Sequence, residues 1–155
     1  MKTGRPRWLL PAAVFAAALL LRVAFLAAFR HTALFDPSLM DAHDQQTFHE
    51  RAVLILRHPW FVDGRPFYMA PLYFYVLAAL DAVSGSSVLF AAAAGAVLDA
   101  GTCVILYDLG RRLFGRTAGL VAGLLAAFYG VFVLYSTAIL SDGLILFLYT
   151  AFIWS

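Results

Sequence analysis

Long apolar runs alternate with one long polar segment along this chain, and that pattern predicts its elements. The first run covers residues 8–29 and is interrupted only by Pro11 and Arg22. A helix needs about 20 apolar residues to cross a bilayer, so this run predicts a membrane span. It is longer than the apolar core of a signal peptide, and no small-residue cleavage site ends it, so we expect an uncleaved span.

The polar segment at 30–69 contains all four histidines of the chain and cannot cross a bilayer. Lys2, Arg5 and Arg7 precede the first span, and basic residues are enriched on the cytoplasmic side of membrane proteins. We therefore expect the N-terminus in the cytoplasm. The polar segment then lies on the outer side, and we assign residues 30–87 to a first outer loop.

The apolar stretch at 70–83 decides the topology. It has about 14 residues, which is short for a span. The turn at 110–116 contains three arginines, which is typical of a cytoplasmic turn. That turn falls inside only if the stretch at 70–83 lies along the outer surface, and this is the arrangement we predict.

The predicted fold is therefore all-α: a polytopic transmembrane helical protein with juxtamembrane helices in its first outer loop. The last apolar run has about 13 residues, fewer than a span needs. We therefore interpret the sequence as the N-terminal part of a longer transmembrane domain. The predicted spans are at about 8–29, 88–109, 117–140 and, cut short, 143–155.

Composition agrees with a membrane protein. Of the 155 residues, 63% are hydrophobic and 13% are charged, whereas a soluble domain has about 25% charged residues. The formal charge of +2 and the scattered basic residues argue against nucleic acid as a partner. Cys103 is the only cysteine, which excludes an intrachain disulfide and a cysteine-cluster metal site.

Two aspartates stand at the edges of predicted helices. From Asp44 onward, apolar residues such as Phe48 and Ala52 recur at helical spacing and predict an amphipathic surface helix that ends near 58–59. Asp44 either only caps this helix or carries chemistry. Asp142 lies between two apolar runs, so it either caps the next helix or faces a polar cavity.

Two charged residues lie inside predicted spans. Arg22 and Asp99 are costly there unless they face a partner or a cavity. They either pair with each other, or Arg22 extends its side chain toward the membrane surface. Gly119 and Gly123 form a small-xxx-small pattern, which predicts close helix packing.

Aromatic residues surround Pro71 in the segment at 67–75. Proline is favoured at the first turn of a helix, so a helix is expected to begin here. Tyrosine is enriched where membrane and water meet. The segment is therefore either an aromatic belt or part of a site at that boundary.

These motifs, taken in order, resemble the GT-C superfamily of membrane glycosyltransferases. The nearest group is the bacterial dolichyl-phosphate-mannose-type and aminoarabinose-transferase-like branch, and the resemblance covers about residues 8–155. The motifs that carry it are Asp44 with Phe48 and Ala52, the run at 67–73, the turn at 109–115, and Asp142 after the third span.

The resemblance implies roles for particular residues. The family's acidic residue of the first outer loop, a general base or a group that positions the acceptor, corresponds to Asp44, with Asp41 as a rival. A second acidic residue corresponds to Asp142. The aminoarabinose branch has a lysine where this chain has Ala70, so a charged donor contact is missing. The substrate-binding candidates are Tyr68, Pro71, Tyr73 and Arg51.

The implied activity is transfer of a sugar from a polyprenyl-phosphate donor to an acceptor on the outer face of the membrane. Direct displacement would invert the anomeric carbon. The alternative is a non-enzymatic polytopic membrane protein, such as a transporter segment or an assembly subunit. A transporter places charges at mid-membrane, and Asp99 is the residue that keeps this alternative open.

We expect a multi-pass protein of the inner (plasma) membrane that meets membrane lipid and a polyprenyl-phosphate-linked sugar. The identity of the acceptor is left open. No cofactor is expected, because the spacing of His43, His49 and His58 matches no tight metal-ligand pattern. A divalent metal stays open as an alternative.

Overall fold

The computed structural model describes residues 8–32, 44–57, 69 and 71–155, and these residues form helices and connecting turns with no strand. This confirms the predicted all-α fold. In chain order the helices are α1 (Leu9–Phe29), α2 (Asp44–Arg57), α3 (Leu72–Ser84), α4 (Val88–Phe114), α5 (Arg116–Phe128), α6 (Gly130–Thr137) and α7 (Asp142–Trp154).

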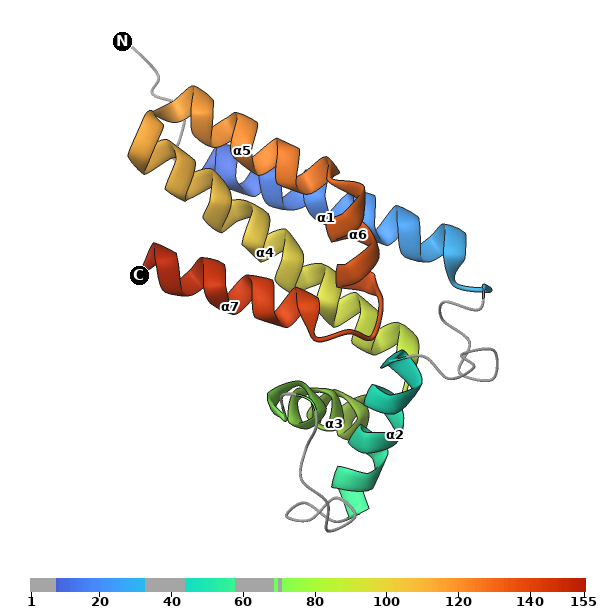
Figure 1. The fold of residues 1–155 in the computed structure, drawn as a ribbon. Coiled ribbons are helices and arrows are strands. Elements are labelled where there is room, and N and C mark those ends of the chain that lie inside the picture. Colours follow the sequence, from blue (N-terminus) through green and yellow to red (C-terminus); the bar gives the residue numbers. More distant parts are fainter. Residues whose placement is uncertain (1–7, 33–43, 58–68, 70) are drawn as a thin grey trace.

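Helix α4 is the centre of the molecule, because α1, α5 and α7 all pack against it. Helices α1, α4 and α5 lie side by side, and the α2–α3 hairpin sits beyond one end of this bundle (Figure 1). The opposite end carries the start of α1, the α4–α5 turn and the end of α7 (Figure 1). The bundle therefore has a hairpin end and a turn end.

Two of these helices are long and apolar enough to cross a membrane. They are α1, with 21 residues, and α4, with 27 residues. The stretch predicted as one span at 117–140 is covered mostly by α5 and α6, which meet at a bend of 56° and would count together as a third. The bend lies at Tyr129, whose extended backbone interrupts the helix. The chain is an integral membrane protein.

Small residues allow α5 to approach α4 closely. A Cβ atom added to Gly119 would lie 2.5 Å from the Tyr107 carbonyl oxygen, and one added to Gly123 would lie 2.9 Å from the Tyr107 Cβ. Both glycines are buried. The packing role predicted from their spacing is confirmed.

Candidate functional site

A buried hydrogen bond joins the start of α2 to the link between α6 and α7. The Ile139 amide donates to the Gln45 side-chain oxygen at 3.1 Å. Asp44 directly precedes Gln45, and Asp142 lies three residues after Ile139. Both aspartates are exposed. We call these four residues the acidic junction; its two acids are 98 positions apart in the chain and each is within three residues of one end of this hydrogen bond.

Tyr73 lies beside the acidic junction. Its ring makes an edge contact with Phe48 of α2, with centroids 4.9 Å apart. It also lines a small cavity of about 30 Å³ with Leu140 and Gly143, the neighbour of Asp142. Burial raises the pKa of the Tyr73 phenol, and the negative charges of Asp142 and Asp81 raise it further. The phenol is therefore a hydrogen-bond donor at physiological pH.

A groove of about 560 Å³ lies between α6 and α7 and reaches α4. Asp142, in the first turn of α7, lines it, and so does Asp99 of α4. The sequence left Asp142 as a helix cap or as a group that faces a polar cavity; in the structure it lines this groove, which is mostly apolar. The remaining lining is mostly apolar and aromatic: Val131, Phe132, Tyr135, Ser136, Gly143, Ile145, Leu146 and Tyr149.

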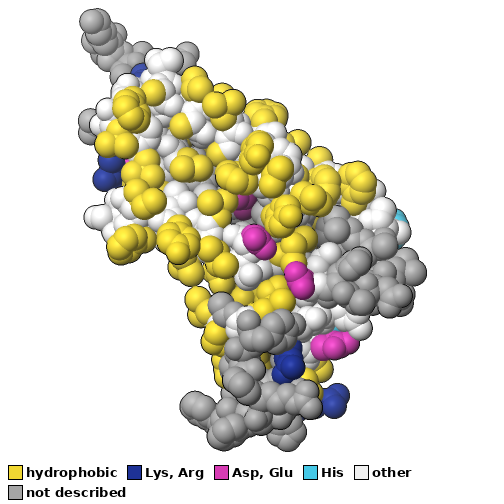
Figure 2. Space-filling view, in the orientation of Figure 1, with side chains coloured by type: hydrophobic (Ala, Val, Ile, Leu, Met, Phe, Trp, Pro, Cys, Tyr) yellow, Lys and Arg dark blue, Asp and Glu magenta, His cyan; other side chains and the backbone are white. Residues whose placement is uncertain are grey.

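Figure 2 shows where the acids lie on this face of the molecule. Acidic side chains gather between the start of α7 and the α2–α3 hairpin, while apolar side chains cover the bundle (Figure 2). The groove and the acidic junction thus share Asp142. This residue lies where the mostly apolar groove meets a polar surface.

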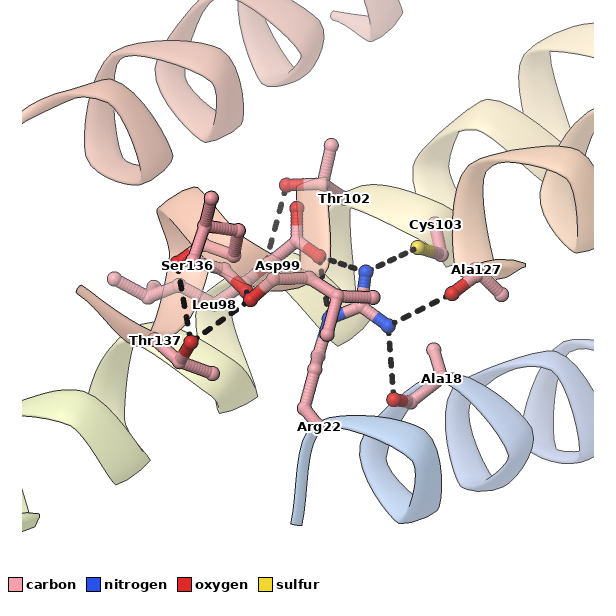
Figure 3. A network of polar contacts seen from close by, with 11 residues as sticks. Ala18, Arg22, Leu98, Asp99, Thr102, Cys103, Ala127, Ser136 and Thr137 are labelled. Carbon is pink, nitrogen blue, oxygen red and sulfur yellow. Dashed lines mark hydrogen bonds and ion pairs between the residues drawn. The ribbon is translucent and has the colours of Figure 1, made fainter. Parts of the chain in front are cut away.

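Beneath the groove, Arg22 and Asp99 form a buried ion pair (Figure 3). Arg22 Nε donates to Asp99 Oδ2 at 2.5 Å, and Nη2 of the same guanidinium contacts that oxygen as well. Arg22 is fully buried, so its side chain does not extend to the membrane surface. Of the two alternatives for these residues, the pair is the one that the structure contains.

Arg22 also supports the bend between α5 and α6. Its Nη1 donates to the Ala18 carbonyl at 2.9 Å and to the Ala127 carbonyl at 3.1 Å (Figure 3). Carbonyls in the last turn of a helix lack an intrahelical donor, and Ala127 is in the last turn of α5. Arg22 supplies that donor. One side chain of α1 therefore stabilises the end of α5, where α6 begins, and α6 forms one side of the groove.

The α2–α3 hairpin encloses a second buried acid. Asp81 Oδ2 lies 3.9 Å from His49 Nδ1, and neither atom has a hydrogen-bond partner among the residues that the structure describes. Burial raises the pKa of Asp81, while the nearby His49 lowers it. No sequence motif indicated this pair. The one available signal was a lone carboxylate in an otherwise apolar stretch.

The other predicted site residues are distributed around the start of the hairpin. Arg51 lies seven residues after Asp44, which is about two helical turns and therefore the same side of α2. Pro71 is exposed at the N-cap position of α3. Asp41 and Tyr68 lie outside the described residues. Gln45, which ties α2 to the α6–α7 link, was not among the predicted residues.

The absence of a cofactor, with a divalent metal as the alternative, stays a prediction for this chain. Within the described ranges, no three His, Cys, Asp or Glu side chains converge on one point. His43 and His58 lie outside those ranges, so the expectation of no cofactor remains open to experiment.

One comparison with known proteins gave a match. The model of the family described as dolichyl-phosphate-mannose-protein mannosyltransferase matches residues 65–155, more than half of the chain. The matched region includes Tyr73, Asp99 and Asp142 and begins after α2. Neither the curated proteins nor the solved structures that were compared with the chain gave a match.

Proposed function

We propose, since the chain belongs to the dolichyl-phosphate-mannose-protein mannosyltransferase family of membrane glycosyltransferases, that it transfers a sugar from a polyprenyl-phosphate donor to an acceptor at the outer face of the membrane. Family membership favours an enzyme over a transporter segment or an assembly subunit. Asp99, which kept that alternative open, is compensated by Arg22.

The observation that carries this proposal is the acidic junction at the end of an apolar bundle. A polyprenyl-phosphate sugar keeps its tail in the bilayer and its sugar phosphate at the surface. Asp44 and Asp142 are exposed at the hairpin end of helices long enough to cross the membrane. The carboxylates therefore lie where a membrane-bound donor and a water-soluble acceptor could meet.

In the proposed reaction Asp44 accepts a proton from the acceptor hydroxyl as that oxygen attacks the anomeric carbon. The bond between that carbon and the phosphate oxygen breaks, and its electron pair leaves with the phosphate. Attack opposite the leaving group inverts the anomeric carbon. Asp142 orients the acceptor from the groove side, and Asp41 is the alternative base.

The leaving phosphate gains negative charge, and a nearby cation stabilises it. Arg51 is our candidate, because it shares a side of α2 with Asp44. Tyr68, Pro71 and Tyr73 are proposed to contact the donor. Tyr73 would do so through its protonated hydroxyl. The proposed location is the inner membrane, with the hairpin end outside and the N-terminus in the cytoplasm.

The test is a sugar-transfer assay in membranes that contain the full-length protein and a radiolabelled polyprenyl-phosphate sugar. Asp44→Asn should lower the transfer rate by about 10²-fold or more, since general-base catalysis contributes 10²–10⁴-fold. Asp142→Asn should lower it less, and Asp41→Asn reports on the rival base.

Glu50→Gln is the matched control, because Glu50 is an exposed carboxylate of the same helix whose hydrogen bond is to Gln46. It should transfer sugar at the wild-type rate. The catalytic assignment is wrong if Asp44→Asn, Asp41→Asn and Asp142→Asn all keep wild-type rates at normal protein levels.

A further inference from the structure

A basic cluster occupies the turn end of the bundle, opposite the proposed site. The Asp108 carboxylate is its centre and accepts four hydrogen bonds. Arg111 donates to Oδ1 through Nε at 2.9 Å and Nη2 at 2.5 Å. Arg112 Nε donates to Oδ2 at 2.6 Å, and Trp154 Nε1 donates to the same atom at 2.9 Å.

Trp154, the last residue of α7, stabilises this arrangement. The Arg112 guanidinium carbon lies 5.0 Å from the centre of the Trp154 ring, which is a cation–π distance. Because two arginines and one indole share a single carboxylate, the orientations of both guanidinium groups are fixed. We call Asp108, Arg111, Arg112, Arg116 and Trp154 the arginine turn.

The arginine turn has an excess of positive charge. Arg111, Arg112 and Arg116 are all exposed, and Asp108 supplies one negative charge. Arg116 has no ion-pair partner among the described residues. Figure 2 shows basic side chains exposed at this end of the bundle. Two positive charges therefore stay uncompensated within the turn.

Apolar side chains are interleaved with these arginines. Leu113 and Phe114 lie between Arg112 and Arg116 and are 69% and 79% exposed. They end α4, which is long enough to cross a membrane, so they lie where its hydrocarbon meets water. A polar cavity of about 300 Å³, lined by Pro11, Tyr107, Asp108 and Arg111, adjoins the turn.

We propose that the arginine turn binds the phosphate group of an anionic phospholipid. A guanidinium presents paired N–H donors that match phosphate oxygens, and Asp108 occupies only part of the donors of Arg111 and Arg112. Leu113 and Phe114 contact the acyl chains beside the headgroup. The exposed apolar pair favours a lipid over free phosphate, and the site is separate from the acidic junction.

The experiment compares the thermal unfolding of the full-length protein in nanodiscs of phosphatidylglycerol and of phosphatidylcholine with the same acyl chains. The wild type should unfold at a higher temperature in phosphatidylglycerol. Arg116→Gln, which leaves the Asp108 contacts intact, should lose part of that difference. The double variant Arg111→Gln/Arg112→Gln should lose most of it.

Arg30→Gln is the control, because Arg30 is exposed at the hairpin end and, among the described residues, its hydrogen bond is to its neighbour His31. It should keep the full difference. The proposal is overturned if Arg30→Gln and Arg116→Gln lose the same amount, which would indicate bulk surface charge. It is also overturned if inorganic phosphate in detergent gives the shift by itself.

Discussion

Two aspartates in this chain are buried to nearly the same extent, with 1% of Asp99 and 2% of Asp81 exposed, yet their surroundings differ. Asp99 faces a guanidinium that is hydrogen-bonded on three sides. Asp81 faces one histidine nitrogen at 3.9 Å, and within the described part of the chain neither atom has a hydrogen-bond partner. Burial costs a carboxylate its hydration in both places, but only Asp99 recovers strong contacts in return.

The comparison distinguishes two parts of the molecule. The scaffold is the helix bundle held by Arg22 and Asp99, and the poised region is the α2–α3 hairpin that contains Asp81 and His49. The Arg22–Asp99 pair joins α1, α4 and the end of α5, so it fixes the bundle and one side of the groove. The hairpin that holds Asp81 carries the Asp44 helix and is tied to the α6–α7 link through Gln45. We therefore expect substitutions at Asp99 to act on folding and substitutions at Asp81 to act on pH response.

The largest effect is expected from breaking the scaffold pair with Arg22→Met. The buried Asp99 carboxylate would lose its partner, and removal of one partner of a buried pair costs roughly 3–5 kcal/mol. The free energy of unfolding in detergent micelles, measured by denaturant titration, should fall by that order. Arg22→Met/Asp99→Leu, which removes both charges, should recover most of the loss. A wild-type titration curve for Arg22→Met would contradict the view that the Arg22–Asp99 pair stabilises the scaffold.

A smaller effect is expected from Gly95→Ala, which tests how tightly the scaffold is packed. A Cβ atom at Gly95 would collide with the backbone carbonyl oxygen of Ser136, so α4 and α6 would have to separate. Overpacking of this kind costs roughly 1–3 kcal/mol, and the melting temperature should fall accordingly. Gly130→Ala is the control, because no atom of the described residues lies within 4 Å of its added Cβ. Equal melting temperatures for the two variants would show that α4 and α6 are not tightly packed at Gly95.

The scaffold was more accessible to sequence analysis than the hairpin, for physical reasons. A charge in an apolar run stands out, so Arg22 and Asp99 were recognised as potential partners. Their pairing could not be decided, because relative depth depends on how helices tilt and slide. The bend at Tyr129 also lacked a signal, since the apolar pattern continues through it without a proline.

The acidic junction was only half predictable. Asp44 and Asp142 were named from their positions beside apolar runs, but the link between their two segments is the Gln45–Ile139 hydrogen bond. That bond joins residues 94 positions apart. No local pattern encodes such a contact. Asp81 and His49 were missed for the same reason, because their relation exists only once α2 packs on α3.

The smallest effect is expected from Asp81→Asn. Whether this substitution raises or lowers the stability tests the poised region. Burial raises the pKa of Asp81 above its ordinary value of 3.8. The folded state therefore binds the proton more tightly than the unfolded chain. Stability from this group is fully present below pH 3.8 and is lost as the pH rises through the raised pKa. His49, across the hairpin, acts in the opposite direction and lowers the pKa of Asp81.

Asp81→Asn should remove that pH dependence. At pH 7 the variant should be more stable than the wild type by about 1 kcal/mol, the lower end of the cost of an unsatisfied buried polar group. At pH 4 the two should converge, as measured by melting temperature across this range. Asp108→Asn should instead lower the stability at pH 7, because it removes a carboxylate that accepts four hydrogen bonds. A lower stability of Asp81→Asn at pH 7 would mean that Asp81 is as well compensated as Asp99.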